Sequence, residues 1–283
     1  MDQKIITLFD TFTHGGMSRR DFLDRLALMA GSVTAATALL PVLENNYAMA
    51  DIVAKNDARL NVSDTEIAPG IKGHFAFPRE TAGKLPAVIV IHENRGLNPH
   101  IKDVTRRIGL EGFVAFGVDY LSPLGGTPDD ADKARDMIGT LKQDDIVATS
   151  SAVLAALAKH EKSNGKVGAM GFCWGGGQVN ALAVADPNLS AGVAYYGRQA
   201  AAADVPKIKA PLMLHYASLD ERVNAGISEF ESALKKGGKI YELHMYEGAN
   251  HAFNNDTNAA RYNKEAADLA WGRTVGFLKT HGS

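Results

Sequence analysis

The chain has 283 residues, of which 46% are apolar and 22% are charged, and its formal net charge is −2. This composition is typical of a globular protein with a sizeable core, and the near-neutral charge argues against nucleic acid as the main partner. The single cysteine excludes an intramolecular disulfide framework and a cysteine-rich metal site.

The first fifty residues have the pattern of an export signal. The segment SRRDFL resembles the twin-arginine motif, whose residues stand here as Ser18, Arg19, Arg20, Phe22 and Leu23. An apolar stretch over residues 26–43 and an Ala-x-Ala cleavage site at residues 48–50 follow in the expected order. Apolar residues surround that stretch instead of lining one face, which disfavours an amphipathic helix of the fold. At roughly 18 residues it is also short of the roughly 20 that a bilayer span needs.

We therefore predict a twin-arginine-type signal peptide over residues 1–50 and a mature protein over residues 51–283. The twin-arginine translocase would be a partner during export, and the mature protein would be periplasmic or secreted. An uncleaved anchor stays open as the alternative.

Beyond residue 50 the chain alternates between predicted strands and predicted helices. Strands are predicted over residues 71–77, 86–91, 113–119, 166–172, 191–196, 212–216 and 240–246. Helices are predicted over residues 98–111, 129–161, 175–185, 224–236 and 257–279. No repeat or change of composition divides this part. The alternation predicts one α/β domain with a mostly parallel sheet and helices on both faces.

The only cysteine lies where a predicted strand meets a predicted helix. Residues 171–175 read GFCWG, and the flanking glycines allow a sharp turn that pushes the Cys173 side chain out over the sheet, as in a nucleophile elbow. The turn lies at the carboxyl end of a strand, where such folds bind ligands, and the start of the helix would favour a thiolate. The alternative is a buried, inert cysteine in a glycine-lined turn.

An acid and a histidine follow in the order that an elbow enzyme requires. Asp220 comes directly after the predicted strand 212–216, and His251 comes after the predicted strand 240–246. His251 would move protons, and Asp220 would orient its ring. A capping aspartate and a loop histidine are the alternatives, but the joint placement favours a catalytic triad.

Four segments together closely resemble the dienelactone hydrolases, a cysteine branch of the α/β-hydrolase fold. They are residues 91–104, residues 171–176, Asp220 and residues 248–253, within a resemblance that covers nearly all of residues 62–278. It implies an α/β-hydrolase fold, with Cys173 as nucleophile, His251 as general acid/base and Asp220 as its carboxylate. It also implies that Glu93 helps to activate the cysteine when substrate arrives. A surface carboxylate at a strand end is the alternative for Glu93.

The implied reaction is acyl transfer to water through a covalent acyl-enzyme. The backbone N–H of Trp174 and a second donor, most simply Asn94, would hold the oxyanion. We expect no metal and no organic cofactor. His92 and His100 flank Glu93, but their spacing makes a zinc site improbable.

The sequence defines the substrate less narrowly than it defines the catalytic residues. Dienelactone hydrolases bind a carboxylate-bearing lactone through arginines in two segments, and the matching residues 119–126 and 251–256 contain none. Arg95 and Arg198 could replace them, although exposed arginines are more often solvated. We therefore expect a small-molecule ester or lactone substrate and an altered pocket. A thioesterase, a general carboxylesterase or a non-catalytic exported binding protein are the alternatives. We expect a monomer.

Overall fold

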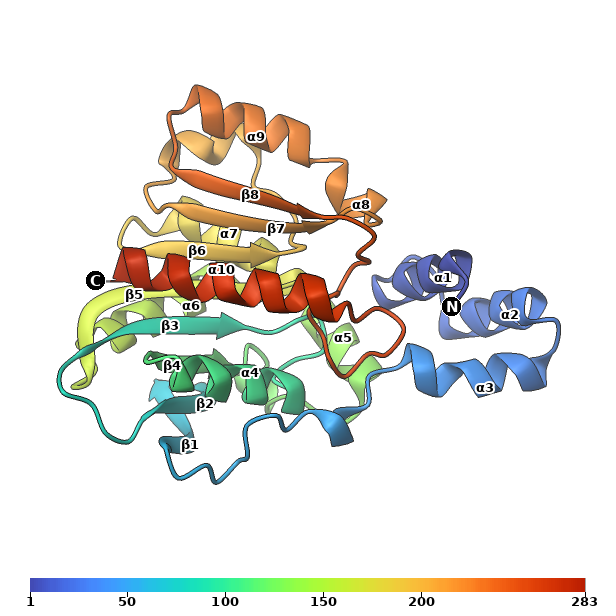
Figure 1. The fold of residues 1–283 in the computed structure, drawn as a ribbon, viewed down its shortest axis with the longest axis horizontal. Coiled ribbons are helices and arrows are strands. Elements are labelled where there is room, and N and C mark those ends of the chain that lie inside the picture. Colours follow the sequence, from blue (N-terminus) through green and yellow to red (C-terminus); the bar gives the residue numbers. More distant parts are fainter. Residues whose placement is uncertain (283) are drawn as a thin grey trace.

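The computed structural model describes residues 1–282, and these are built around one eight-stranded sheet (Figure 1). Its strands lie in the order β1-β2-β4-β3-β5-β6-β7-β8. Strands β3 to β8 run parallel, while β2 pairs antiparallel with both β1 and β4. The strand bounds are β1 Leu60–Ala68, β2 Ile71–Pro78, β3 Leu85–Ile91, β4 Val114–Val118, β5 Ser163–Phe172, β6 Ala191–Tyr195, β7 Leu212–Ala217 and β8 Tyr241–Tyr246.

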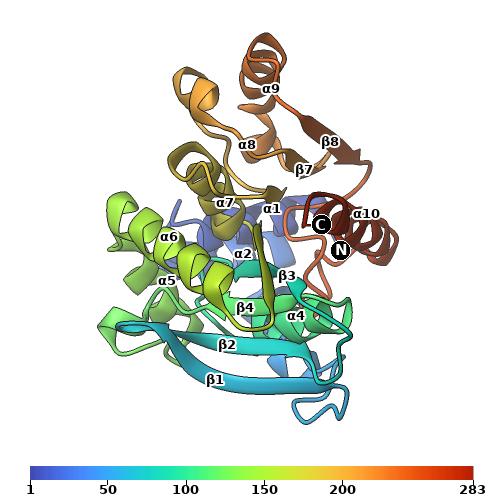
Figure 2. The same ribbon diagram turned by 90° about the vertical axis from the view of Figure 1, so that its left-hand side faces the viewer.

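Helices cover both faces of the sheet, as Figure 2 shows. Helices α4 and α10 pack on one face, and α6, α7 and α9 pack on the other, each group over its own hydrophobic core. The helix bounds are α4 Pro99–Leu110, α5 Ala131–Gly139, α6 Gln143–Lys159, α7 Trp174–Ala185, α8 Glu221–Asn224, α9 Ile227–Lys236 and α10 Lys264–Gly282. The predicted α/β-hydrolase architecture, with a mostly parallel sheet between two helical layers, is confirmed.

Each predicted strand is present within two or three residues of its predicted ends, but β1 was not predicted. It is an edge strand whose central residues are exposed on both sides, so it carries little alternation for a pattern to detect. The predicted helix 129–161 breaks into α5 and α6 after Gly139, and the predicted helix 224–236 breaks at Gly226. Glycine is the weakest helix former after proline, which is consistent with both breaks.

The predicted last helix, 257–279, begins only at Lys264. The preceding residues form a loop whose asparagine side chains hold its backbone. Asn255 accepts hydrogen bonds from the backbone N–H and the hydroxyl of Thr257, and Asn258 accepts one from the N–H of Arg261. Such local bonds offer the backbone an alternative to a helix. The loop therefore stays irregular where it passes the carboxyl ends of the strands.

The first fifty residues, which we call the N-terminal unit, fold into three helices and a short 3-10 turn. Their bounds are α1 Gln3–Thr13, α2 Arg19–Ala30, α3 Val33–Leu43 and η1 Tyr47–Met49. The unit lies beside the carboxyl ends of the parallel strands, drawn in blue in Figure 1. Its helices share a small apolar cluster of their own, which includes Phe9, Phe12, Phe22, Leu26 and Leu43.

The residues of the export motif have structural contacts in this unit. The Ser18 side chain caps α2 by accepting a hydrogen bond from the N–H of Asp21, and Arg19 pairs with Asp132 at 2.8 Å. Phe22 is buried and stacks on Phe12. These contacts are those of the chain that retains residues 1–50. Cleavage of this segment after export stays a prediction.

No single helix within residues 1–282 is long and apolar enough to cross a membrane. Helix α2 and the stretch Val33–Met49 meet the length and composition requirement only as a pair that bends by 111°, and a signal sequence near an N-terminus meets the same requirement.

Candidate active site

Cys173 lies at the sharp turn between β5 and α7. Its backbone has φ 55° and ψ −114°, which is rare for a residue with a side chain. A Cβ on Gly175 would lie 2.5 Å from the carbonyl oxygens of Ile91 and His92, and one on Gly171 would lie 2.3 Å from that of Gly175. Only glycine fits at these two positions, so the strand and the helix can approach closely enough to raise the thiol over the sheet.

The N-terminus of α7 opens directly behind the thiol. Trp174 is the first residue of this helix, so its N–H has no acceptor within the helix and is available to an oxyanion. The Trp174 ring stacks on the buried His92 ring, with centroids 5.2 Å apart, and forms a wall of the site. Asn94, on the loop after β3, lines the cavities on both sides of Cys173.

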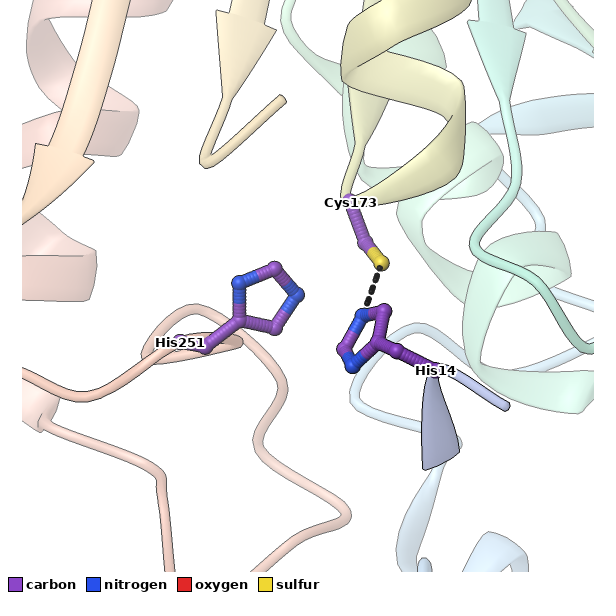
Figure 3. A group of neighbouring side chains, drawn as sticks. All are labelled: His14, Cys173 and His251. Carbon is purple, nitrogen blue, oxygen red and sulfur yellow. Dashed lines mark hydrogen bonds between the residues drawn. The ribbon is translucent and has the colours of Figure 1, made fainter. Parts of the chain in front are cut away.

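His251 and Asp220 meet at the ends of β8 and β7. The Nδ1–H of His251 donates to Asp220 Oδ2 at 2.5 Å, and both side chains are buried. His251 Nε2 has no hydrogen-bond partner within residues 1–282, and Figure 3 shows the ring turned toward Cys173. Asp220 Oδ1 separately accepts the N–H of Val223 and caps α8. Asp220 thus has both the orienting role and the capping role that the sequence left as alternatives.

A second imidazole, which the sequence analysis missed, contacts the thiol. His14, which follows α1, places Nε2 3.2 Å from Cys173 Sγ (Figure 3). Its Nδ1–H donates to the carbonyl oxygen of Asp10 at 2.7 Å, which fixes the ring. The only sequence signal was a histidine four residues after an aspartate at a helix end. This spacing does not distinguish a catalytic histidine from one within an export segment.

These groups shift one another's protonation. Burial is the largest effect on Cys173 and raises its pKa, but the positive charges of His251 and His14, together with the hydrogen bond from His14, outweigh burial and lower the thiol pKa to about 6. Burial lowers the pKa of His251, yet the negative charges of Asp10, Cys173 and Asp220 raise it well above its usual value. Burial likewise opposes ionisation of Asp220, but His251 holds the pKa of Asp220 below its usual range. A thiolate beside an imidazolium is therefore the favoured resting state near neutral pH.

Glu93 is buried at the end of β3 but is not hydrogen-bonded to the thiol. Its Oε2 accepts from the Asn255 amide at 2.9 Å, whereas Oε1 has no partner within the described residues 1–282. Glu93 and Cys173 line the same cavity. An unpartnered, buried carboxylate oxygen is available to a substrate or a proton, and the activating role that the family resemblance implies stays a prediction.

Two cavities meet at Cys173, and His14 lines both. The smaller, of about 450 Å³, lies between the N-terminal unit and the α/β domain and contains Glu93 and Arg95. The larger, of about 1020 Å³, is lined by Trp174 and Arg198 among others. Arg95 lies 3.5 Å from Asp132 and is mostly buried, whereas Arg198 is exposed. The two candidate substrate arginines therefore serve different cavities.

The ligand atoms of His14, Cys173 and His251 lie within 4.8 Å of one another, a set of two imidazoles and a thiol that is chemically able to bind zinc. However, Arg222 Nη2 lies 3.1 Å from His14 Nε2 and would have to move before a metal ion could bind there. His92 and His100 do not belong to this set, and His100 instead pairs with Asp256 at 3.1 Å. That the protein works without a metal stays a prediction.

Two family models match the chain. Residues 71–282 match the dienelactone hydrolase family, and residues 1–31 match a family described as YqhI-like. The first match spans every strand from β2 to β8 and all of the side chains discussed above except those of the N-terminal unit. The second match indicates that the N-terminal unit carries a sequence pattern of its own.

Known proteins agree with the first match. The chain is 33% identical over 229 residues to a Saccharolobus solfataricus protein described as "Putative carboxymethylenebutenolidase", covering 68% of this chain and 88% of the relative. It is 32% identical over 214 residues to a Bradyrhizobium protein described as "Probable 2-oxo-3-(5-oxofuran-2-ylidene)propanoate lactonase", covering 70% and 85%. A Klebsiella pneumoniae crystal structure titled as a "Putative Dienelactone Hydrolase" superposes with a TM-score of 0.70 at 25% identity, covering 78% and 98%. The chain is therefore a hydrolase of the dienelactone hydrolase family.

Proposed function

We propose that this protein hydrolyses ester or lactone bonds, with Cys173 as nucleophile, His251 as general acid/base and Asp220 as the carboxylate that orients His251. The observation that supports this most directly is the convergence of three loops at three strand ends. There, His251 is held by Asp220 and directs its unpartnered Nε2 toward a thiol whose pKa is lowered. Nucleophilic acyl transfer needs this combination.

The reaction proceeds in two steps. The Cys173 thiolate attacks the carbonyl carbon, a C–S bond forms, and the carbonyl electron pair moves to oxygen. The backbone N–H groups of Trp174 and Asn94 would stabilise this oxyanion. The C–O bond then breaks as the His251 imidazolium protonates the leaving alkoxide. In the second step His251 removes a proton from water, which attacks the thioester, and the thiolate leaves.

The names of relatives and the residues near Cys173 both support a substrate class. The relatives' names include a carboxymethylenebutenolidase and a lactonase, which supports an ester or lactone. Neither segment that carries the substrate arginines in the family contains one here, and the smaller cavity has the buried Glu93 on its wall. Without those arginines an anionic group would lose its charge-assisted contacts, so we expect a neutral ester or lactone to be preferred over dienelactone. Thioesters are the nearest alternative, because the same thiol chemistry cleaves them.

The full-length chain should be compared with Cys173→Ala on p-nitrophenyl esters, neutral lactones, cis-dienelactone and acyl thioesters. We expect the wild-type enzyme to hydrolyse neutral esters or lactones and the variant to lose turnover while its thermal unfolding stays unchanged. The surface variant Asp204→Asn serves as control, since Asp204 pairs with Lys207 at the surface, away from Cys173. Full activity of Cys173→Ala would eliminate the mechanism, and an inactive wild type would favour a binding protein on the same scaffold.

We also propose export by the twin-arginine route, with a periplasmic or secreted location. The ordered motif, apolar stretch and Ala-x-Ala site support this proposal. Replacing both Arg19 and Arg20 with lysine should hold the protein in the cytoplasm, whereas Arg25→Lys should not. Unimpaired export of the double variant, measured by cell fractionation, would contradict the proposal, and the mass of the exported chain would show whether residues 1–50 are retained.

A further inference from the structure

We propose that the N-terminal unit is a working part of the active site and that His14 is a second catalytic imidazole, which accepts the proton of the Cys173 thiol. The proposal rests on the proposed function, because it assigns His14 a role in the reaction of that nucleophile. It applies to the chain that retains residues 1–50.

The atomic contacts give His14 the geometry of a base. Its Nδ1–H is committed to the Asp10 carbonyl, so the lone pair of a neutral ring lies on Nε2, the atom 3.2 Å from Sγ. The His14 ring meets the His251 ring edge to face, with centroids 4.7 Å apart. One sulfur therefore has two imidazoles beside it (Figure 3). Each imidazole is anchored through its other nitrogen, His14 by the Asp10 carbonyl and His251 by Asp220.

Two imidazoles allow the proton transfers to be divided. Before substrate reacts, the thiol proton has passed to His14 Nε2, and the electron pair of the resulting thiolate forms the bond to the carbonyl carbon. His251, already protonated, delivers its proton to the leaving oxygen and then takes one from the attacking water. When the thiolate is expelled, it pairs again with the protonated His14. The net reaction consumes one water and leaves both imidazoles as they began.

Charged groups on three elements face these imidazoles. Asp10 on α1 lies 3.4 Å from His14 Nδ1, and Asp220, which caps α8, holds His251. Arg222 on α8 donates to His14 Nε2 at 3.1 Å and pairs with Asp10 at 3.6 Å. Arg261, from the loop before α10, also pairs with Asp10, at 3.5 Å. Arg222 is half-exposed, so it can withdraw when Nε2 takes a proton, and Asp10 then neutralises the imidazolium.

The unit is fixed to the α/β domain by contacts on both sides of His14. The Asn94 amide donates to the carbonyl of Thr13 at 2.7 Å, directly beside His14. The cation–π pairs Arg135–Phe12 and Arg261–Phe9 hold α1 against the domain, each with 5.1 Å between the guanidinium carbon and the ring centroid.

The end of the unit is held by hydrogen bonds that involve its backbone. The Asn258 amide donates to the carbonyl of Leu43 at 2.6 Å, and the N–H of Asn46 donates to the carbonyl of Thr257 at 2.7 Å. The loop that carries His251 thus also holds the end of the unit.

The experiment uses the full-length chain and the variants His14→Gln, His14→Ala and His244→Gln. Two quantities are measured across pH 5 to 9: kcat/KM on the best ester and the rate of Cys173 alkylation by iodoacetamide. His244 lies on β8, where it pairs with Glu242 at 3.2 Å, and is the matched control. We expect His14→Gln to lower kcat/KM by about 100-fold, the low end of what a positioned base contributes. The midpoint of alkylation should move to a higher pH, because a positive charge near the thiolate is lost.

Imidazole rescue separates chemistry from folding. Added imidazole should restore part of the activity of His14→Ala and none of any activity that His244→Gln loses. If His14→Gln and His14→Ala both keep kcat/KM and the alkylation midpoint of the wild type, His14 has no catalytic role. If His14→Ala is folded but inactive and imidazole does not restore it, the role is structural and the proposal is also wrong.

The alkylation measurement does not depend on turnover. Should the wild type hydrolyse none of the substrates, the proposed function fails, but a shifted midpoint in His14→Gln would still show that His14 stabilises the thiolate. If the wild type is active and His14→Gln leaves the pH midpoint of Cys173 alkylation unchanged, the proposed role of His14 is wrong while the proposed function stands.

Discussion

The N-terminal unit and the α/β domain are built in different ways, although both contribute to one site. The domain buries two extended cores against the two faces of its sheet. The unit has one small cluster of aromatic and aliphatic side chains and is joined to the domain mainly by hydrogen bonds, ion pairs and cation–π contacts. Polar contacts contribute less net stability than apolar burial, so the unit is the part that can loosen first. The domain therefore supplies the framework of the reaction, and the unit supplies the adjustable part of the site.

The largest expected effect lies in the domain. Asp220→Asn should lower kcat by about 10²- to 10⁴-fold, because a neutral amide no longer fixes the tautomer of His251 or stabilises its imidazolium. Asparagine retains a side-chain oxygen that can accept from Val223 N–H, so the cap of α8 and the melting temperature should persist. Activity within threefold of wild type would remove Asp220 from the reaction and weaken the division between framework and unit.

An intermediate effect is expected at the boundary between the two regions. Glu93→Gln should lower kcat/KM by about 10-fold and change its pH profile, because the amide cannot exchange a proton with the site. Glutamine can still accept from the Asn255 amide through its side-chain oxygen, so the fold should be preserved. The readout is kcat/KM from pH 5 to 9. An unchanged profile would confine Glu93 to a structural role.

The smallest expected effect on the whole molecule comes from the unit. Phe12→Ala removes a buried ring that stacks on Phe22 with centroids 4.7 Å apart, and such truncations cost about 3–5 kcal/mol locally. We expect faster proteolysis of residues 1–50 and a shift of the main melting transition of no more than about 2 °C.

Leu234→Ala is the matched control, since Leu234 is fully buried in a core of the domain. It should lower the main transition by about 4–20 °C, from a cost of about 2–5 kcal/mol and about 2–4 °C per kcal/mol. If Phe12→Ala lowers the main transition as much, the unit and the domain unfold as one body, and the comparison between them does not hold.

The sequence by itself determined the domain, because its signals are local. The apolar run 86–91 is consistent with a strand buried on both faces, and in β3 residues 87–91 are buried. Gly171 and Gly175 flank Cys173 at the spacing that a sharp turn requires, and that turn is present. Asp220 and His251 could be placed near the thiol because the carboxyl ends of parallel strands share one edge of the sheet.

Only the tertiary structure decided how that edge is completed. The hydrogen bond between His14 and Cys173 joins residues 159 positions apart, and no local pattern records such a contact. The same holds for the separation of Arg95 and Arg198 into two cavities. Periodicity reports which face of an element is buried, whereas the groups that meet across a cleft depend on how distant elements pack. An apolar segment next to paired arginines fits both an export signal and a folded unit. In the structure this segment is part of a folded unit, in which Phe9, Phe12 and Phe22 pack together.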